Sequence, residues 1–180
     1  MITYIALLRG INVGGHKKIK MADFRLLLKG LGYKEVLTYI QSGNVVFKSK
    51  VTDHRKLENE ISKAIKKQYE FDVAVIVKTK TELVNILKNN PFNDLDDLAA
   101  NKIYFVLLKD IPQKRNIEMA SIKDFENEQF FITPECIFVR YALGAGKAKC
   151  GVNYFESKLK VDATARNYRT MMKLVELSSS

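Results

Sequence analysis

Two glycine-bearing segments rich in lysine carry the residue types that bind anions. The first, Arg9–Lys20, contains Gly10, Gly14, Gly15 and Lys17. Glycines let backbone N–H groups approach a ligand closely, and lysines supply positive charge. The segment fits neither G-x-G-x-x-G nor G-x-x-x-x-G-K-[ST], so neither nucleotide-binding fingerprint applies. A solvated loop with no ligand is the alternative.

The second segment, Arg140–Gly151, resembles a phosphate-binding loop only superficially. Tyr141 stands where the first glycine of that loop should be, and Ala148 replaces the hydroxyl residue that binds Mg²⁺. The pattern therefore excludes nucleotide hydrolysis, although anion contact stays open.

Two shorter polar segments are further candidates. Thr164–Thr170 contains Arg166, Asn167 and Arg169, which we place at the start of the last helix. Arginine suits bidentate contact with an oxyanion, but arginine stems also cover apolar surface on a helix face. The fourth segment is the expected turn Gln41–Asn44. Its polar residues are explained by turn chemistry alone, and no base is apparent that would make a serine there nucleophilic.

The first helix has an unusual electrostatic environment. Lys17, Lys18 and Lys20 lie just before its expected start at Met21. A helix N-terminus carries about half a positive charge, so cations there are unfavourable unless an anion docks. This placement favours the first segment as an anion site.

Cysteine and histidine usage points to no cofactor. Cys136 lies in a strand-like run and is expected to be a buried thiol, whereas Lys147 and Lys149 could lower the pKa of the Cys150 thiol. Neither histidine has metal-ligand spacing to another residue, so we expect no metal and no cofactor.

The order of hydrophobic patterns predicts the fold. Residues 3–9, 34–41, 44–48 and 72–78 are strand-like, and residues 21–31 and 53–69 have helical periodicity. This β-α-β-β-α-β order is that of ferredoxin-like domains. A helix from the capping box Thr79-x-x-Glu82 and an acidic connector, residues 91–100, follow.

The second half repeats the order more weakly. We expect strands at 102–109, 129–133, 136–141 and 161–165, with helices at 112–120, 152–160 and 166–177, and Pro112 in a first helical turn. The predicted class is α+β, with two tandem ferredoxin-like (βαββαβ) halves. The expected domains are 1–80, the helix and connector 81–100, and 101–180 with its terminal helix.

Charge and hydropathy limit the location and the partners. The net charge is +10, with an excess of +7 in residues 1–50 and +6 in residues 140–173. Two separated basic regions favour polyanion contact over uniform scatter, although a lysine-rich soluble surface would look similar. No stretch approaches the roughly 20 apolar residues of a membrane span, so we expect a cytoplasmic protein with no membrane contact.

These segments also resemble a bacterial family, domain of unknown function 1697. Leu8–Gly15 followed by Met21, and then Thr38–Phe47, look like its N-terminal signature. Thr164–Thr170 is similar to its C-terminal motif, with Tyr168 where tryptophan is frequent. The resemblance implies two ferredoxin-like parts in a cytoplasmic protein and no particular activity. It singles out the first, third and fourth segments.

Three functions remain open from these observations. The favoured one is an anion-binding module that contacts nucleic acid or another polyanion, with Tyr4 and Phe47 on central strands as aromatics for base stacking. The second is an enzyme or sensor for a small phosphorylated or carboxylated ligand. The third is a protein-interaction or oligomeric scaffold, for which a homodimer is one form. The candidate anion-binding residues are Arg9, Gly10, Asn12, Gly14, Gly15, Lys17, Ser42, Asn44, Arg166, Asn167 and Arg169.

Overall fold

The computed structural model describes residues 1–179, which divide into two compact units. The first unit holds residues 1–85 and the C-terminal residues from 173 onward, and the second holds residues 86–172. The division falls within α3 (Lys80–Lys88) and α7 (Tyr168–Leu177). The expected domain boundaries at residues 80 and 100 stay a prediction.

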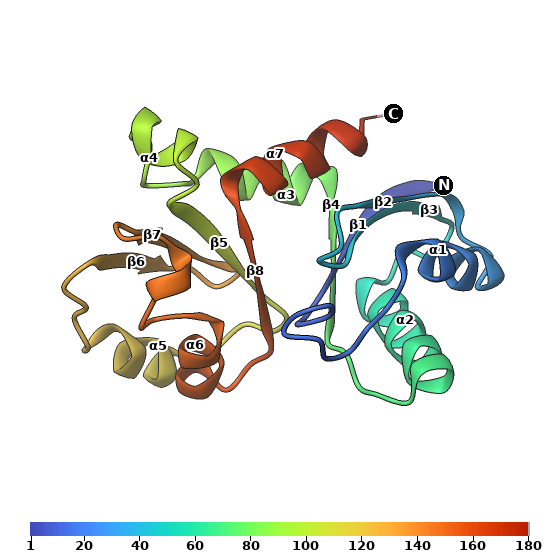
Figure 1. Cartoon of the computed structure of the whole chain (residues 1–180), viewed down its shortest axis with the longest axis horizontal. Helices are drawn as coiled ribbons and strands as arrows, with labels where there is room; N and C mark the ends of the chain where they lie inside the picture. Colours follow the sequence, from blue (N-terminus) through green and yellow to red (C-terminus); the bar gives the residue numbers. More distant parts are fainter. Residues whose placement is uncertain (180) are drawn as a thin grey trace. The chain divides into compact units, whose positions relative to one another are not determined.

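The first unit is a four-stranded antiparallel sheet with two helices on one face (Figure 1). The strands lie in the order β2-β3-β1-β4, which is the ferredoxin-like arrangement that the sequence predicts. Its elements are β1 (Ile2–Leu8), α1 (Met21–Gly30), β2 (Lys34–Tyr39), β3 (Asn44–Ser49), α2 (His54–Tyr69) and β4 (Val75–Thr79).

Alternation along β1 explains how this sheet is covered. Tyr4, Ala6 and Leu8 point to the helices and share a core with Phe24 and Leu28 of α1. Side chains two apart on a strand share a face, so the apolar stripe of each helix packs on this row. The loop after β1 therefore joins two elements, β1 and α1, that the shared core holds in place.

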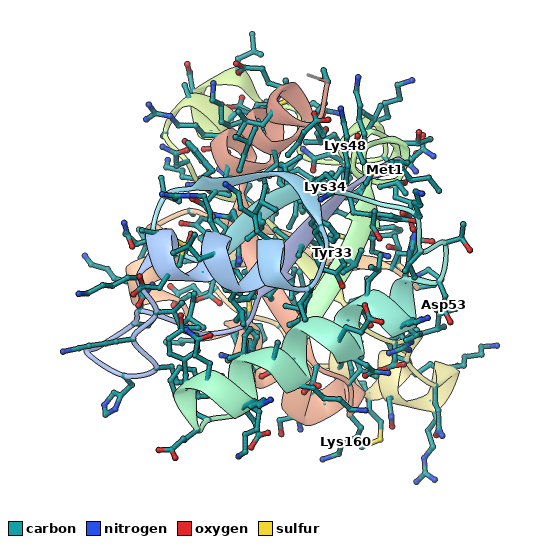
Figure 2. The ribbon with its side chains drawn as sticks, turned by 90° about the vertical axis from the view of Figure 1, so that its right-hand side faces the viewer. Met1, Tyr33, Lys34, Lys48, Asp53 and Lys160 are labelled. Atoms are coloured by element: carbon teal, nitrogen blue, oxygen red, sulfur yellow. The ribbon has the colours of Figure 1, made fainter. Side chains whose placement is uncertain are left out.

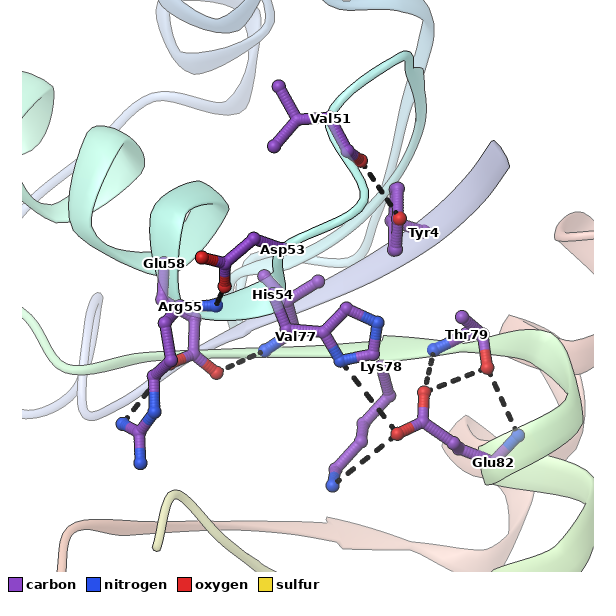
Figure 3. Close-up of polar contacts among 10 residues, drawn as sticks. All are labelled: Tyr4, Val51, Asp53, His54, Arg55, Glu58, Val77, Lys78, Thr79 and Glu82. Carbon is purple, nitrogen blue, oxygen red and sulfur yellow. Dashed lines mark hydrogen bonds and ion pairs between the residues drawn. The ribbon is translucent and has the colours of Figure 1, made fainter. Parts of the chain in front are cut away.

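Polar side chains set the ends of α2 and α3. The Asp53 carboxylate accepts hydrogen bonds from the first turn of α2, as expected. The buried Glu58 carboxylate accepts from the Val77 N–H at 3.0 Å and fastens α2 to β4 (Figure 3). The capping box is also confirmed, because Thr79 N–H donates to Glu82 at 2.7 Å and Glu82 N–H donates to the Thr79 hydroxyl at 3.3 Å.

The second unit repeats the arrangement, with strands in the order β6-β7-β5-β8. The α+β class with two ferredoxin-like halves is thereby confirmed. Among residues 1–179, no helix has the length and apolar character that crossing a membrane requires. The remaining elements are α4 (Leu95–Ala99), β5 (Ile103–Leu108), α5 (Lys114–Ser121), β6 (Glu128–Ile132), β7 (Cys136–Tyr141), the 3₁₀ turn η1 (Ala145–Lys147), α6 (Val152–Leu159) and β8 (Ala163–Asn167).

The connector 91–100 contains the short helix α4, because the Asp94 carboxylate caps it by accepting from Asp97 N–H. Two local expectations were wrong. Pro112 precedes the N-cap of α5 rather than lying in its first turn. The last strand, β8, continues to Asn167, so Arg166 belongs to a strand and not to a helix start.

Candidate functional site

The loop between β1 and α1 is a small hairpin. Its tip is a tight turn in which His16 N–H donates to the Val13 carbonyl at 3.0 Å. The two central residues, Gly14 and Gly15, have φ of 57° and 78°. Tight hairpin turns of this kind need positive φ at both central positions, which explains the two glycines. Figure 2 shows this loop, in pale lavender-blue at the lower left, extending beyond the ends of the two helices of the first unit.

Asn12 fixes the base of this loop. Its side-chain amide donates to the carbonyls of Ile19 at 2.9 Å and Gln41 at 2.7 Å. Its side-chain oxygen accepts from Ile19 N–H at 2.9 Å. Asn12 thus joins the loop to the β2–β3 turn, and its amide is engaged by backbone groups rather than exposed at the tip.

The basic side chains of the loop are exposed. Lys17 Nζ donates to the Asp72 carbonyl at 2.7 Å, and Lys66 of α2 pairs with the Asp72 carboxylate at 2.7 Å. Lys17 and Lys66 therefore meet at one residue, which places the loop beside the last turn of α2. We call the exposed lysines Lys17, Lys18, Lys20 and Lys66 the basic loop surface.

The start of α1 adds to this positive region. Lys20 is its N-cap residue and makes no side-chain capping hydrogen bond. Asp23 in the first turn is the acidic residue that opposes the lysines there. Ser, Thr, Asn or Asp is preferred at this position, so the start of α1 has no capping bond from its N-cap side chain.

The β2–β3 turn contacts the base of the loop. Gly43 has φ of 76°, and a Cβ there would come within 2.6 Å of Leu8 Cβ, so only glycine fits. The amide of Asn44, which is fully buried, donates to the Tyr39 carbonyl and to the Ser42 hydroxyl. Ser42 and Asn44 hold the turn in shape.

The second glycine-bearing segment already holds an anion, which is a carboxylate of the protein itself. Lys149 N–H and Cys150 N–H each donate to a Glu128 oxygen at 2.6 Å. Burial favours the neutral acid, but these hydrogen bonds outweigh it, and the pKa of Glu128 lies below its ordinary value. The backbone donors ahead of α6 are therefore filled from β6.

The two thiols are buried. Cys136 is fully buried in β7, as expected. The expectation that lysines lower the pKa of Cys150 was wrong. Burial raises the pKa of its thiol, and the neighbouring Glu128 carboxylate raises it further. Cys150 is therefore an inert thiol in this fold.

The arginine segment differs from the expected helix start. Arg166, on β8, is 7% exposed and donates to the Thr164 hydroxyl at 2.8 Å. Burial lowers the pKa of its guanidinium to about 10. Asn167 ends β8 and accepts from Thr170 N–H at 2.9 Å, which caps α7. Arg169 is exposed in the first turn of α7.

The idea that Tyr4 and Phe47 stack bases is contradicted. They are 1% and 0% exposed, and their ring centroids lie 5.8 Å apart within the core. Ile5 and Val46, on the opposite face of the same strands, are also buried. The central strands of this sheet therefore offer no exposed aromatic platform of the kind that RNA-binding sheets use.

The candidate residues thus separate into two groups. Arg9, Gly10, Asn12, Gly14, Gly15, Lys17, Ser42 and Asn44 lie in the first unit and are connected through the Asn12–Gln41 contact. Arg166, Asn167 and Arg169 lie in the second unit. The sequence did not indicate Lys66, Asp72 or Glu128, because their partners come from other elements. Within residues 1–179, no group of three His, Cys, Asp or Glu side chains could hold a metal ion.

Comparison with known proteins gives a family and a related fold. A family model described as "Protein of unknown function (DUF1697)" matches residues 1–138. The chain is also similar to the conserved bacterial protein SP0830 from Streptococcus pneumoniae, with 22% identity, a TM-score of 0.73 and 98% of each chain covered. No curated protein matches the sequence. The family match includes the β1–α1 loop and the β2–β3 turn but not residues 164–170.

Proposed function

Because the chain belongs to the DUF1697 family, whose description names no activity, its function rests on its own residues, and we propose that it binds nucleic acid through the basic loop surface. Any polyanion with similar charge spacing would meet the same lysines. The ligand phosphates lie against Lys17, Lys18 and Lys20, and the N-terminus of α1 adds its dipole.

One observation carries this proposal. The hairpin loop projects exposed lysines from a base that Asn12 fixes by three hydrogen bonds. A loop whose backbone is fixed at its base loses less conformational entropy on binding than a flexible loop does. The two glycines at the tip have no side chains, so the phosphates of a nucleic acid can approach the lysines.

The remaining candidate residues have different parts in the proposal. Gly10, Gly14 and Gly15 shape the loop, while Asn12, Ser42 and Asn44 hold its base. Arg9 begins the loop, and its N–H donates to the Ala74 carbonyl at 2.9 Å. Arg166, Asn167 and Arg169 are not part of the basic loop surface.

A salt titration tests the proposal. Labelled single-stranded DNA of about 20 nucleotides is expected to bind near 50 mM salt, with affinity that falls steeply as salt rises. Replacing Lys17, Lys18 and Lys20 by alanine is expected to reduce the slope of log K against log salt by about 2, since each phosphate contact on a single strand contributes about 0.7.

A matched triple variant separates site from net charge. Lys114, Arg115 and Lys158 are exposed on α5 and α6 of the second unit. Their replacement by alanine removes the same charge and should leave most of the slope unchanged. Equal losses in the two triple variants would contradict a localised site, and no binding at low salt would contradict the function. Thermal stabilisation by inorganic phosphate without DNA binding would favour a small anionic ligand instead.

A further inference from the structure

The edge strand β6 of the second unit has backbone groups that no strand pairs. β6 is the terminal strand in the order β6-β7-β5-β8 (Figure 1). Thr133 N–H donates to the Cys136 carbonyl, and Ala142 N–H donates to the Asn127 carbonyl. These two bonds show which residues of β6 form hydrogen bonds with β7 and which do not. Since every second residue of an antiparallel strand bonds to its neighbour, the N–H and C=O groups of Phe130 and Ile132 point away from β7.

Between Glu128 and Glu135 this edge lacks two of the features that normally prevent strand addition, which are charged side chains and a bulge. β2, the corresponding edge in the first unit, carries Lys34 and Glu35 and has a register shift between Lys34 and Leu37. Charges and bulges of this kind block edge-to-edge pairing. β6 has a regular register along its whole length, and Phe131 is 56% exposed on it. No charged residue lies between Glu128 and Glu135.

A groove runs along the same edge. Its volume is about 590 Å³, and its lining includes Asp124, Phe125, Glu126, Phe130 and Ile132. Phe125 and Phe130 pack edge to face with ring centroids 6.2 Å apart and form an apolar wall. The groove can take alternate apolar side chains of a strand added at β6.

The charges beside the groove select the partner. The charged residues that line the groove are three acids, Asp124, Glu126 and Glu128, and one base, Lys123. Asp124 and Glu126 are exposed, whereas Lys123 Nζ lies 5.0 Å from the centre of the Phe125 ring. The groove is thus locally acidic on a chain with a net charge of +10. A strand with basic residues complements it, and an acidic strand does not.

A second copy of the chain fits the same edge poorly. Its own edge would bring residues 124–135, which contain no lysine or arginine, to face Asp124 and Glu126. A basic partner therefore complements this edge better than another β6 does.

We propose that β6 binds an extended basic segment of another protein by strand addition. The backbone of that segment bonds to Phe130 and Ile132. Its apolar residues enter the groove beside Phe125, and its basic residues meet Asp124 and Glu126. Main-chain bonds give affinity in this mode of recognition, and alternate side chains give specificity. The surface is independent of the basic loop surface.

Two synthetic peptides test the choice of partner. The first alternates lysine and valine over about seven residues, with capped ends, and the second replaces each lysine with glutamate. Net charge alone would make this basic protein prefer the glutamate peptide. Preferential binding of the lysine peptide, measured by fluorescence anisotropy, is the expected result. Equal or stronger binding of the glutamate peptide would overturn the proposal.

Amide hydrogen exchange on the wild-type protein locates the peptide. The amides of Phe130 and Ile132 are expected to exchange at least about tenfold more slowly when the lysine peptide is bound. Gln129 and Phe131 already bond to β7, so their amides serve as the internal control and change little. Binding without protection at Phe130 and Ile132 would overturn the proposal.

Matched variants test the groove. Reversing both charges by Asp124→Lys and Glu126→Lys is expected to weaken the lysine peptide about tenfold. Glu118→Lys with Asp162→Lys is the control, because both residues are exposed in the same unit outside the groove. Phe131→Lys should also weaken binding, whereas Leu37→Lys on the exposed edge of the first unit should not.

Sedimentation velocity tests whether a second copy of the chain, rather than another protein, binds at the β6 edge. Dimers of the wild-type protein that Phe131→Lys dissociates would show that a second copy takes this edge and would overturn the proposal. A monomer at all concentrations, together with lysine-peptide binding, supports it.

Discussion

Two basic, glycine-bearing segments precede helices in the two units, yet the structure uses them differently. Ahead of α6, the N–H groups of Lys149 and Cys150 are both taken by the Glu128 carboxylate. Ahead of α1, Lys20 makes no side-chain capping bond, and the loop is fixed instead by Asn12. The first arrangement satisfies two backbone donors internally, whereas the second has no side-chain cap at the start of its helix. Similar composition therefore does not imply a similar site.

The largest effect is expected where the loop of the first unit is fixed. Asn12→Ala should lower the free energy of unfolding by about 3 kcal/mol, because three hydrogen bonds are lost and the φ of 55° at this position is unfavourable for alanine. Urea denaturation measures this change. Asn89→Ala, at an exposed position, is the control and should stay within about 0.5 kcal/mol of the wild type. A small effect of Asn12→Ala would mean that the base of the loop is not fixed by this residue.

Removing the Glu128 carboxylate should leave the N–H groups of Lys149 and Cys150 without their acceptor. Glu128→Ala should lower the free energy of unfolding by about 2 kcal/mol, since two charge-assisted hydrogen bonds are lost in a partly exposed setting. The emptied donors should then bind sulfate, so that sulfate restores part of the stability of the variant beyond its effect on the wild type. Urea denaturation in chloride and in sulfate checks this. A sulfate effect equal to that on the wild type would contradict it.

Glycine substitutions sharpen the comparison at the level of the backbone. Gly15→Ala should lower stability by about 1 kcal/mol, because its φ of 78° is unfavourable for alanine. Gly146 has ordinary φ and nothing within 4 Å of an added Cβ. Gly146→Ala should therefore change stability little, and thermal denaturation of both variants measures the difference. Equal effects would show that the loop turn does not need its glycines.

The smallest effect is expected in the stability at acid pH, where the Glu128 carboxylate becomes protonated. The folded-state pKa of Glu128 lies below its ordinary value of 4.5, so its contribution to stability is full above about pH 4.5 and is lost as the pH falls through the folded value. Glu128→Gln lacks this titration, and the stability difference between wild type and variant should therefore shrink on acidification. Urea denaturation from neutral to acid pH measures the difference. A constant difference would contradict the role of the carboxylate.

The sequence predicted most elements because their periodicity is local. The helical stripe of α1, the capping box of Thr79 and Glu82 and the turn at Gly43 each depend on residues close in the chain. The end of β8 was misplaced because pairing with β5, at Phe105 with Arg166, extends the strand. That pairing is a long-range interaction, and local propensity carries no signal for it.

The basic loop in the first unit was thus determined by the sequence itself, through its glycines, its lysines and its position between a strand and a helix. Only the tertiary structure decided which partners the polar groups of the two segments bond to. Glu128 reaches Lys149 and Cys150 from a strand about 20 residues away in the chain, and Asn12 reaches the carbonyl of Gln41 from another loop. Hydrogen bonds depend on neighbours in space, so the two similar segments acquired different partners: a carboxylate bonds the backbone ahead of α6, and an amide fixes the base of the loop ahead of α1.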